Sequence, residues 1–381
     1  MFVEGKAMAE KFGAENVFDF SLGNPATPAP VKVREALIKI AQETESLKLH
    51  GYMDNAGFPE VRRAVADNLN RRFGTTFAEG NIVMTVGAAG AINVVLKTIL
   101  NPGEEVIVFA PYFTEYNSYI NNWDGRIVQV KPDITTFQPD FEDFRAKITE
   151  KTKAVIINNP VNPSGVVYNG ETVKELARIM EEKQRGLGTD IYLVSDEPYR
   201  ELVYDGATVP FLTKYYANTF VTYSFSKSLS LPGERIGYIA VSDDMKDFDE
   251  VMMGLSLSNR ISGFVNAPSI MQLVIKECVD CETDLEYYDT NRKLLYGNLK
   301  KLGFECIYPD GAFYLFMKSP EEDDLRFVER AKKHHIIMVN GTSFGCPGYV
   351  RLAYCLKTEA IERSYAAFEK LAAEYGLKGE A

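Results

Sequence analysis

Residues 219–241 read TFVTYSFSKSLSLPGERIGYIAV and hold one lysine between two apolar runs. The runs at 220–224 and 236–241 are rich in β-branched and aromatic residues, which is typical of buried strands. Lys227 stands between them among serines, and Arg235 follows eight residues later. A lysine that attacks a carbonyl needs partial desolvation and a lowered pKa, whereas an exposed lysine needs no such setting. The segment therefore predicts two strands joined by a turn that carries a candidate reactive lysine.

Similar apolar runs recur earlier in the chain and alternate with segments of helical periodicity, such as 87–100 and 173–186. The seven predicted strands are 82–86, 105–109, 126–130, 154–158, 191–195, 220–224 and 236–241. Strands that alternate with helices are the signature of a sheet covered by helices on its faces. The predicted fold class is therefore α/β, with a mostly parallel seven-stranded sheet.

The pattern changes near residue 268, where long helices are followed by short strands and by a closing helix at 359–376. This change predicts a second, smaller α+β domain. We expect the large domain to span 30–290, and the small domain to combine 1–29 with 291–381.

Composition narrows the class of protein. The 381 residues are 46% hydrophobic, which is ample for a globular core. The formal net charge is −11 without a long basic run, which argues against a nucleic-acid partner. Five cysteines form an odd set without the spacing of a disulfide framework, so reduced thiols in the cytoplasm are the simpler interpretation. Cys278 and Cys281 have no second pair or histidine nearby, so no metal is predicted.

The N-terminal segment 1–13 is helix-like and charged, without the apolar core of a signal peptide. No window approaches eighteen uninterrupted apolar residues, so no membrane-spanning helix is predicted. We therefore expect a cytoplasmic protein.

Polar segments follow four of the predicted strands, and open α/β sheets place their ligands where strands end. The first segment, 85–91, is a small-residue turn at a helix start, where free N–H groups favour a phosphate. Close helix packing is the alternative explanation of its small residues. The second segment, 158–165, contains two Asn-Pro steps, which are typical of a rigid loop. Asn162, held there by a proline, could also donate a hydrogen bond to a fixed oxygen.

The third and fourth segments supply charged groups. Asp196 leaves an apolar strand, and its carboxylate could either cap a helix or hold a buried cation. Ser224, Ser226 and Arg235 could together bind a phosphate. Arg235 would also lower the pKa of Lys227 by like-charge repulsion. We therefore expect four groups to lie close together. They are a phosphate site, a lysine that can react with a carbonyl, a carboxylate that can bind a cation, and an amide that can donate a hydrogen bond to an oxygen.

Pyridoxal phosphate is one small molecule that needs all four of these groups. The chain resembles, over nearly its whole length, the class I/II aminotransferases, the fold type I group of pyridoxal-phosphate enzymes that includes aspartate aminotransferase. Several motifs match this family in order along the chain. They are Tyr52 with Gly57 in YMDNAGFPEVR, the NPSG turn at 162–165, Asp196 with Tyr199, and Lys227 with Arg235.

The resemblance implies a role for each residue of the expected cofactor site. Lys227 would form the Schiff base and move the proton between the substrate carbon and the cofactor. Asp196 would pair with the pyridine nitrogen, and Asn162 and Tyr199 would bond the phenolic oxygen. The remaining cofactor contacts implied are backbone N–H groups of Ala88 and Ala89, the side chains of Ser224, Ser226 and Arg235 on the phosphate, and the ring of Phe113 on the pyridine. Tyr52 would reach the phosphate of a neighbouring subunit, which implies a homodimer.

The resemblance also implies a substrate site. Arg351, in YVRLAY, would bind the α-carboxylate of the substrate through two hydrogen bonds from its guanidinium, and Gly23 would lie near the same carboxylate. Asn162 would contact the substrate as well as the cofactor. A surface strand residue is the alternative interpretation of Arg351. Arg260 falls near the position where aspartate-using relatives place an arginine from the partner subunit. It is equally open to interpretation as a surface arginine without a function.

The predicted function is a pyridoxal-phosphate-dependent aminotransferase of amino-acid metabolism with ping-pong exchange. An L-amino acid, for which aspartate or another dicarboxylate is the best candidate, would give its amino group to a 2-oxo acid such as 2-oxoglutarate. A β-lyase or synthase on the same framework, or an aromatic or aliphatic aminotransferase, is an alternative. Two further alternatives are a non-catalytic ligand-binding domain of a transcription regulator and a nucleotide-binding oxidoreductase. The oxidoreductase rests on the turn at 87–90 alone and leaves Lys227 unexplained.

Overall fold

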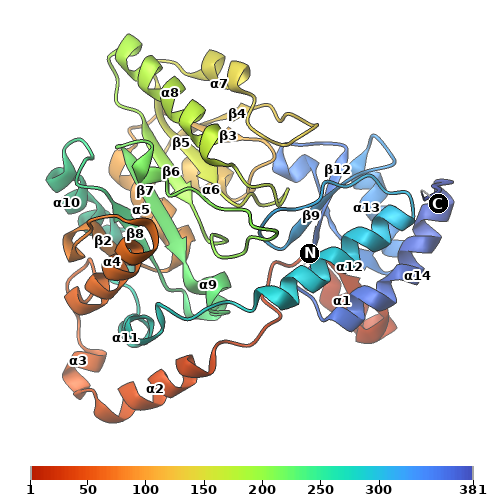
Figure 1. Ribbon diagram of the computed structural model, residues 1–381, viewed down its shortest axis with the longest axis horizontal. Coiled ribbons are helices and arrows are strands. Elements are labelled where there is room, and N and C mark those ends of the chain that lie inside the picture. Colours follow the sequence, from red (N-terminus) through yellow and green to blue (C-terminus); the bar gives the residue numbers. More distant parts are fainter. Residues whose placement is uncertain (1, 380–381) are drawn as a thin grey trace.

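The computed structural model describes residues 2–379 and contains one large sheet with seven strands in the order β2-β8-β7-β6-β5-β3-β4 (Figure 1). The strands are β2 (Ile82–Thr85), β3 (Glu105–Phe109), β4 (Arg126–Val130), β5 (Thr152–Asn158), β6 (Tyr192–Asp196), β7 (Thr219–Ser224) and β8 (Gly237–Val241). All seven predicted strands are confirmed, with ends within two residues of the predicted ones.

Strand β8 explains where the candidate lysine lies. It runs antiparallel to both β2 and β7, whereas β4, β3, β5, β6 and β7 are parallel to one another. A parallel neighbour would require a crossover connection, but β8 follows β7 through the short helical turns α9 (Phe225–Ser228) and η4 (Pro232–Glu234). This connection therefore remains at the carboxyl edge of the sheet, and it carries Lys227 there.

Helices cover both faces of the large sheet because successive strand residues point to opposite sides. In β3, Val106 and Val108 pack in the cluster that contains α5 (Gly87–Ile99), whereas Ile107 and Phe109 pack in the cluster that contains α8 (Gly170–Leu187). The other helices around the sheet are α2 (Val31–Glu43), α3 (Ser46–His50), α4 (Pro59–Phe73), α6 (Tyr116–Asn121), α7 (Phe141–Lys147), α10 (Phe248–Asn259) and α11 (Ser269–Cys278). Burial on both faces accounts for the nearly continuous apolar strands.

The remainder of the chain forms a second group of elements with its own apolar cluster. Its strands are β1 (Phe18–Asp19) paired in parallel with β10 (Ile336–Ile337), and an antiparallel set of β11 (Val339–Asn340), β12 (Tyr349–Ala353) and β9 (Tyr314–Lys318). Its helices are α1 (Phe2–Phe12), α12 (Leu285–Lys301), α13 (Asp324–Lys333) and α14 (Thr358–Glu374). Figure 1 shows α1 among these C-terminal helices, and the ion pair between Glu4 and Lys332 at 2.6 Å joins α1 to α13.

The helices and strands predicted after residue 268 are confirmed, but α11, the first of them, packs with the large sheet, and only the later ones belong to this second group. The two-residue pair β1 and β10 was not predicted, because so short a strand has no recognisable period. The division into domains at 30–290 stays a prediction. Within residues 2–379, no helix combines the length and apolar content needed to cross a membrane.

Candidate active site

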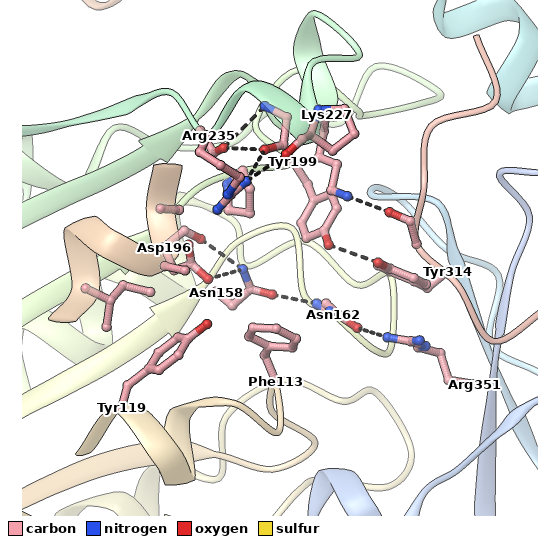
Figure 2. A pocket seen from close by; sticks show the side chains of 18 residues that line it. Phe113, Tyr119, Asn158, Asn162, Asp196, Tyr199, Lys227, Arg235, Tyr314 and Arg351 are labelled. Atoms are coloured by element: carbon pink, nitrogen blue, oxygen red, sulfur yellow. Dashed lines mark hydrogen bonds between the residues drawn. The ribbon is translucent and has the colours of Figure 1, made fainter. Parts of the chain in front are cut away.

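A cavity of about 390 Å³ lies where β5, β6 and β7 end, and β9 and β12 contribute to its wall (Figure 2). Twelve of the predicted site residues line it: Gly23, Ala88, Ala89, Phe113, Asn162, Asp196, Tyr199, Ser224, Ser226, Lys227, Arg235 and Arg351. The expectation that the four strand-end segments meet at one site is therefore confirmed.

Two predicted residues lie away from this cavity. The side chain of Tyr52 is 92% exposed. Arg260 is exposed at the start of the short π-helical turn η5 (Arg260–Phe264). Both were expected to act in the site of a neighbouring subunit, and these roles stay predictions.

Lys227 lies in the single turn α9, which begins where the Ser224 side chain accepts a hydrogen bond from the Ser226 backbone N–H. Its Nζ atom donates to the carbonyl oxygen of Gly23 at 2.5 Å. Burial is the main cause that lowers the pKa of Lys227 to about 8, and the charges of Arg235 and Arg351 make smaller contributions in the same direction. The direction expected from the sequence is found, but desolvation rather than the neighbouring arginine is the larger cause.

Asp196 is the last residue of β6 and lies opposite Asn158 of β5 in the sheet register. Its Oδ2 atom accepts hydrogen bonds from the Tyr116 hydroxyl at 2.6 Å and from Asn158 Nδ2 at 3.2 Å. Its Oδ1 atom is buried and has no partner among the described residues. Burial raises the pKa of Asp196 to about 7. The carboxylate is thus held by one oxygen, and the other is available for a positively charged N–H group.

Another part of the cavity collects groups that bind anions. Gly87 begins α5 with a φ of +77°, and a Cβ atom there would lie 2.7 Å from Nη2 of Arg235. Arg235 donates from Nη1 to the Ser226 hydroxyl at 3.3 Å, and the Ser224 and Ser226 hydroxyls are 2.7 Å apart. A guanidinium, two hydroxyls and the start of a helix therefore converge, an arrangement that suits a phosphate.

Arg351 of β12 lies on the side of the second group of elements (Figure 2). It donates from Nη1 to Asn162 Oδ1 at 2.9 Å and from Nη2 to the Ser21 carbonyl at 2.6 Å. Its Nε atom is buried without a partner among the described residues, and the whole residue is only 7% exposed. The alternative interpretation of Arg351 as a surface residue is therefore wrong.

Sequence reasoning missed four polar or aromatic residues at this site: Tyr116, Tyr119, Asn158 and Tyr314. Tyr116 begins α6, three residues after Phe113, and its backbone N–H donates to the Phe113 carbonyl at 3.1 Å. Its contact with Asp196 depends on this turn, which the sequence pattern did not reveal. Asn158 ends a predicted strand, but only the register reveals that it faces Asp196.

Comparison with known proteins places these features in a family. The model of the family described as aminotransferase class I and II matches residues 15–368. An aspartate aminotransferase of Thermotoga maritima is 31% identical, over 95% of this chain and 94% of its own. An aspartate/prephenate aminotransferase of Thermus thermophilus is 30% identical, over 97% of this chain and 94% of its own.

Solved structures show the same likeness. A crystal structure of an amino transferase from Eubacterium rectale has a TM-score of 0.96 and 44% identity, and covers 98% of this chain and 94% of its own. Aspartate aminotransferase from Thermus thermophilus with maleate has a TM-score of 0.87 and 30% identity, and covers 97% of this chain and 96% of its own. The α/β fold with a mostly parallel seven-stranded sheet is shared with these structures.

Proposed function

Since the chain belongs to the class I and II aminotransferases, we propose that it uses pyridoxal phosphate to transfer an amino group from an L-amino acid to a 2-oxo acid. One observation supports the cofactor most directly. The buried Oδ1 atom of Asp196, which lacks a partner among the described residues, lies in the same cavity as a buried lysine whose pKa is lowered to about 8.

The residues of the cavity fit each part of this cofactor. The unpartnered oxygen of Asp196 suits a protonated ring nitrogen, whose positive charge would stabilise the buried carboxylate. Arg235 and the start of α5 suit the phosphate, and the aromatic side chain of Phe113 suits the ring. When bound, pyridoxal phosphate supplies an electron sink for the bonds at the substrate α-carbon.

Lys227 provides both a nucleophile and a proton carrier. With a pKa of about 8, a much larger fraction of its amine is neutral near neutral pH than in an ordinary lysine, and a neutral amine can attack a carbonyl or accept a proton. We assign to its Nζ atom the removal of the proton from the substrate α-carbon. The hydrogen bond from Nζ to the Gly23 carbonyl fixes the side chain within the cavity.

Arg351 is assigned to the substrate α-carboxylate. Asn162 and the Ser21 carbonyl hold its guanidinium in one plane, and the Nε atom has no partner among the described residues. A carboxylate that binds there would lose its hydrogen bonds to water and gain charge-assisted hydrogen bonds from the guanidinium.

Arg351→Lys should weaken all amino donors, because they share the α-carboxylate and lysine lacks the bidentate fork. The expected loss in kcat/KM corresponds to roughly 1.5–3 kcal/mol, the range for a hydrogen bond to a charged group. Steady-state kinetics with aspartate and with phenylalanine would measure this loss. A loss confined to one donor would show that Arg351 does not bind the shared carboxylate.

The proposed donor is aspartate or another dicarboxylate. The names of the relatives support this proposal, and one Thermus structure was solved with maleate, which is a dicarboxylate. Within the described residues, however, the cationic side chains that line the cavity are Lys227, Arg235 and Arg351 alone. Each of them already has an assigned role, so a second substrate carboxylate would need a cation from the neighbouring subunit, for which we propose Arg260.

The same shortage of cations favours one alternative, an aromatic or aliphatic amino donor. A panel of donors assayed with 2-oxoglutarate distinguishes the two, and it also separates transamination from a lyase reaction by its products.

Arg260→Leu should lower kcat/KM for aspartate and leave kcat/KM for phenylalanine unchanged or improved. Arg363→Leu, which changes an exposed arginine of α14, is the matched control. An unchanged ratio of aspartate to phenylalanine efficiency would place the second carboxylate elsewhere.

A homodimer is part of the proposal, because Arg260 and Tyr52 would act only across a subunit boundary. Large apolar side chains exposed on α2, α3 and α10 support it, among them Val31 (74%), Leu47 (81%) and Met253 (68%).

We also propose a cytoplasmic location, which the five free cysteines support because thiols persist in reducing compartments.

A further inference from the structure

Tyr314 contacts three of the predicted site residues, and each contact is of a different kind. It is the first residue of β9, is 3% exposed and lines the cavity. Its hydroxyl is hydrogen bonded to Tyr199, its ring faces Arg351, and it fills the space beside Gly23. The sequence predicted only a short strand here and assigned no role to this side chain.

The ring of Tyr314 orients Arg351. The guanidinium carbon lies 4.4 Å from the centre of the Tyr314 ring and 5.1 Å from that of Phe344. A cation is attracted to the face of an aromatic ring, and more strongly in a buried site than in water. These contacts fix the plane of the guanidinium, and a plain phenyl ring would suffice for them.

The hydroxyl of Tyr314 acts on Tyr199 instead. The two phenol oxygens are 3.0 Å apart, and one shared hydrogen bond uses only one of their two protons. Burial raises the pKa of Tyr314 to about 12 and that of Tyr199 well above its ordinary value, so both phenols stay protonated near neutral pH. If Tyr314 donates to Tyr199, the proton of Tyr199 is free to be donated into the cavity.

The same hydroxyl explains why residue 23 is glycine. A Cβ atom on Gly23 would overlap the hydroxyl oxygen of Tyr314, and it would lie 3.0 Å from the Cζ atom of that ring and 3.3 Å from Phe313. The Gly23 carbonyl in turn accepts the hydrogen bond from Lys227. The absence of a side chain at residue 23 therefore lets Tyr314, Tyr199 and the lysine share one corner of the cavity.

We propose that Tyr314 is a positioning residue with two separable parts. Its ring orients Arg351 toward the substrate α-carboxylate, and its hydroxyl holds Tyr199 as a hydrogen-bond donor toward the phenolic oxygen of the cofactor. The second part rests on the proposed function, because it requires pyridoxal phosphate. The first part requires only that a carboxylate binds at Arg351.

Two substitutions separate the parts. Tyr314→Leu removes the ring and should weaken binding of hydrocinnamate, a carboxylate without an amino group, by about 3- to 30-fold, the range of a cation–π contact. Tyr314→Phe keeps the ring and should leave this affinity unchanged. It should instead raise the pH midpoint at which the absorption of the bound cofactor changes, because Tyr199 then stabilises the phenolic anion less. Tyr204→Phe is the control, since it removes a buried hydroxyl that bonds the Ala312 carbonyl outside the cavity.

A third measurement tests the contact between residues 23 and 314 through the melting temperature, and it needs no cofactor. Gly23→Ala should lower the melting temperature, and it should do so by less when combined with Tyr314→Phe, because the overlapping oxygen is then gone.

The possible failures are distinguishable. Wild-type protein that takes up no pyridoxal phosphate would overturn the proposed function and the hydroxyl role together. Equal hydrocinnamate affinity in the Leu and Phe variants would overturn the ring role. A midpoint unchanged in Tyr314→Phe, or shifted equally by Tyr204→Phe, would overturn the hydroxyl role while the proposed function stands. Additive effects of Gly23→Ala and Tyr314→Phe would overturn the explanation of the glycine.

Discussion

Lys227→Ala should fold normally and lose turnover by more than about 10²- to 10⁴-fold, the range expected for loss of proton transfer alone. We expect a loss of turnover beyond this range because no other lysine among the described residues lines the cavity. No amine is then left to form the covalent link to the cofactor. Turnover of aspartate with 2-oxoglutarate would measure the effect. Lys246→Ala, which changes an exposed lysine paired with Asp190, should leave turnover unchanged.

Chemical labelling tests the same assignment independently of rate. Borohydride should fix pyridoxal phosphate on Lys227 of the wild-type protein, and peptide mapping should find the label on no other lysine. The alanine variant should bind the cofactor only reversibly. Label on a different lysine, or near-normal turnover in the variant, would make Lys227 a structural residue.

Asp196→Asn should lower kcat by a large factor and change cofactor affinity much less. The substitution keeps the shape of the side chain but removes the negative charge that would stabilise a protonated ring nitrogen. The hydrogen-bond partners Tyr116 and Asn158 are neutral, and Asp196 is the only carboxylate among the described residues that line the cavity, so no other negative charge there can replace it. Rate and cofactor dissociation constant should both be measured on the reconstituted variant. Weak cofactor binding with a normal rate would show that Asp196 is an anchor only.

In the protein without cofactor, the same substitution should change how the stability of the fold depends on pH. The pKa of Asp196 is raised to about 7 in the folded state, so between pH 4 and 7 the folded chain binds more protons than the unfolded chain. The stability from this group is thus fully present below its unfolded pKa and is lost as pH rises to about 7. Urea unfolding of wild type should therefore lose roughly 2–3 kcal/mol more between pH 5 and pH 8 than unfolding of Asp196→Asn. Equal losses would contradict the buried, unpartnered carboxylate.

Local sequence patterns were sufficient to predict the large sheet and the location of the site. Strand β3 was predicted without error because its side chains are apolar on both faces, a property visible in five consecutive residues. Asn162, Asp196 and Lys227 each follow the carboxyl end of a predicted strand. Because parallel strands end at one edge of a sheet, these three residues were predicted to lie at one site. The resemblance of motifs extended the site to Arg351, far away in the chain.

The tertiary structure alone decided how these side chains are held. Asn158 faces Asp196 only through the register of β5 and β6. Tyr314 meets Arg351 through the pairing of β9 with β12, and it reaches Tyr199 only through packing of β9 against the segment that follows β6. The lowered pKa of Lys227 follows chiefly from burial, which no single segment contains. Register, packing and desolvation depend on contacts between residues far apart in the chain. Strand period and turn chemistry depend on neighbours, so the sequence by itself determined the elements and the chemistry at their ends.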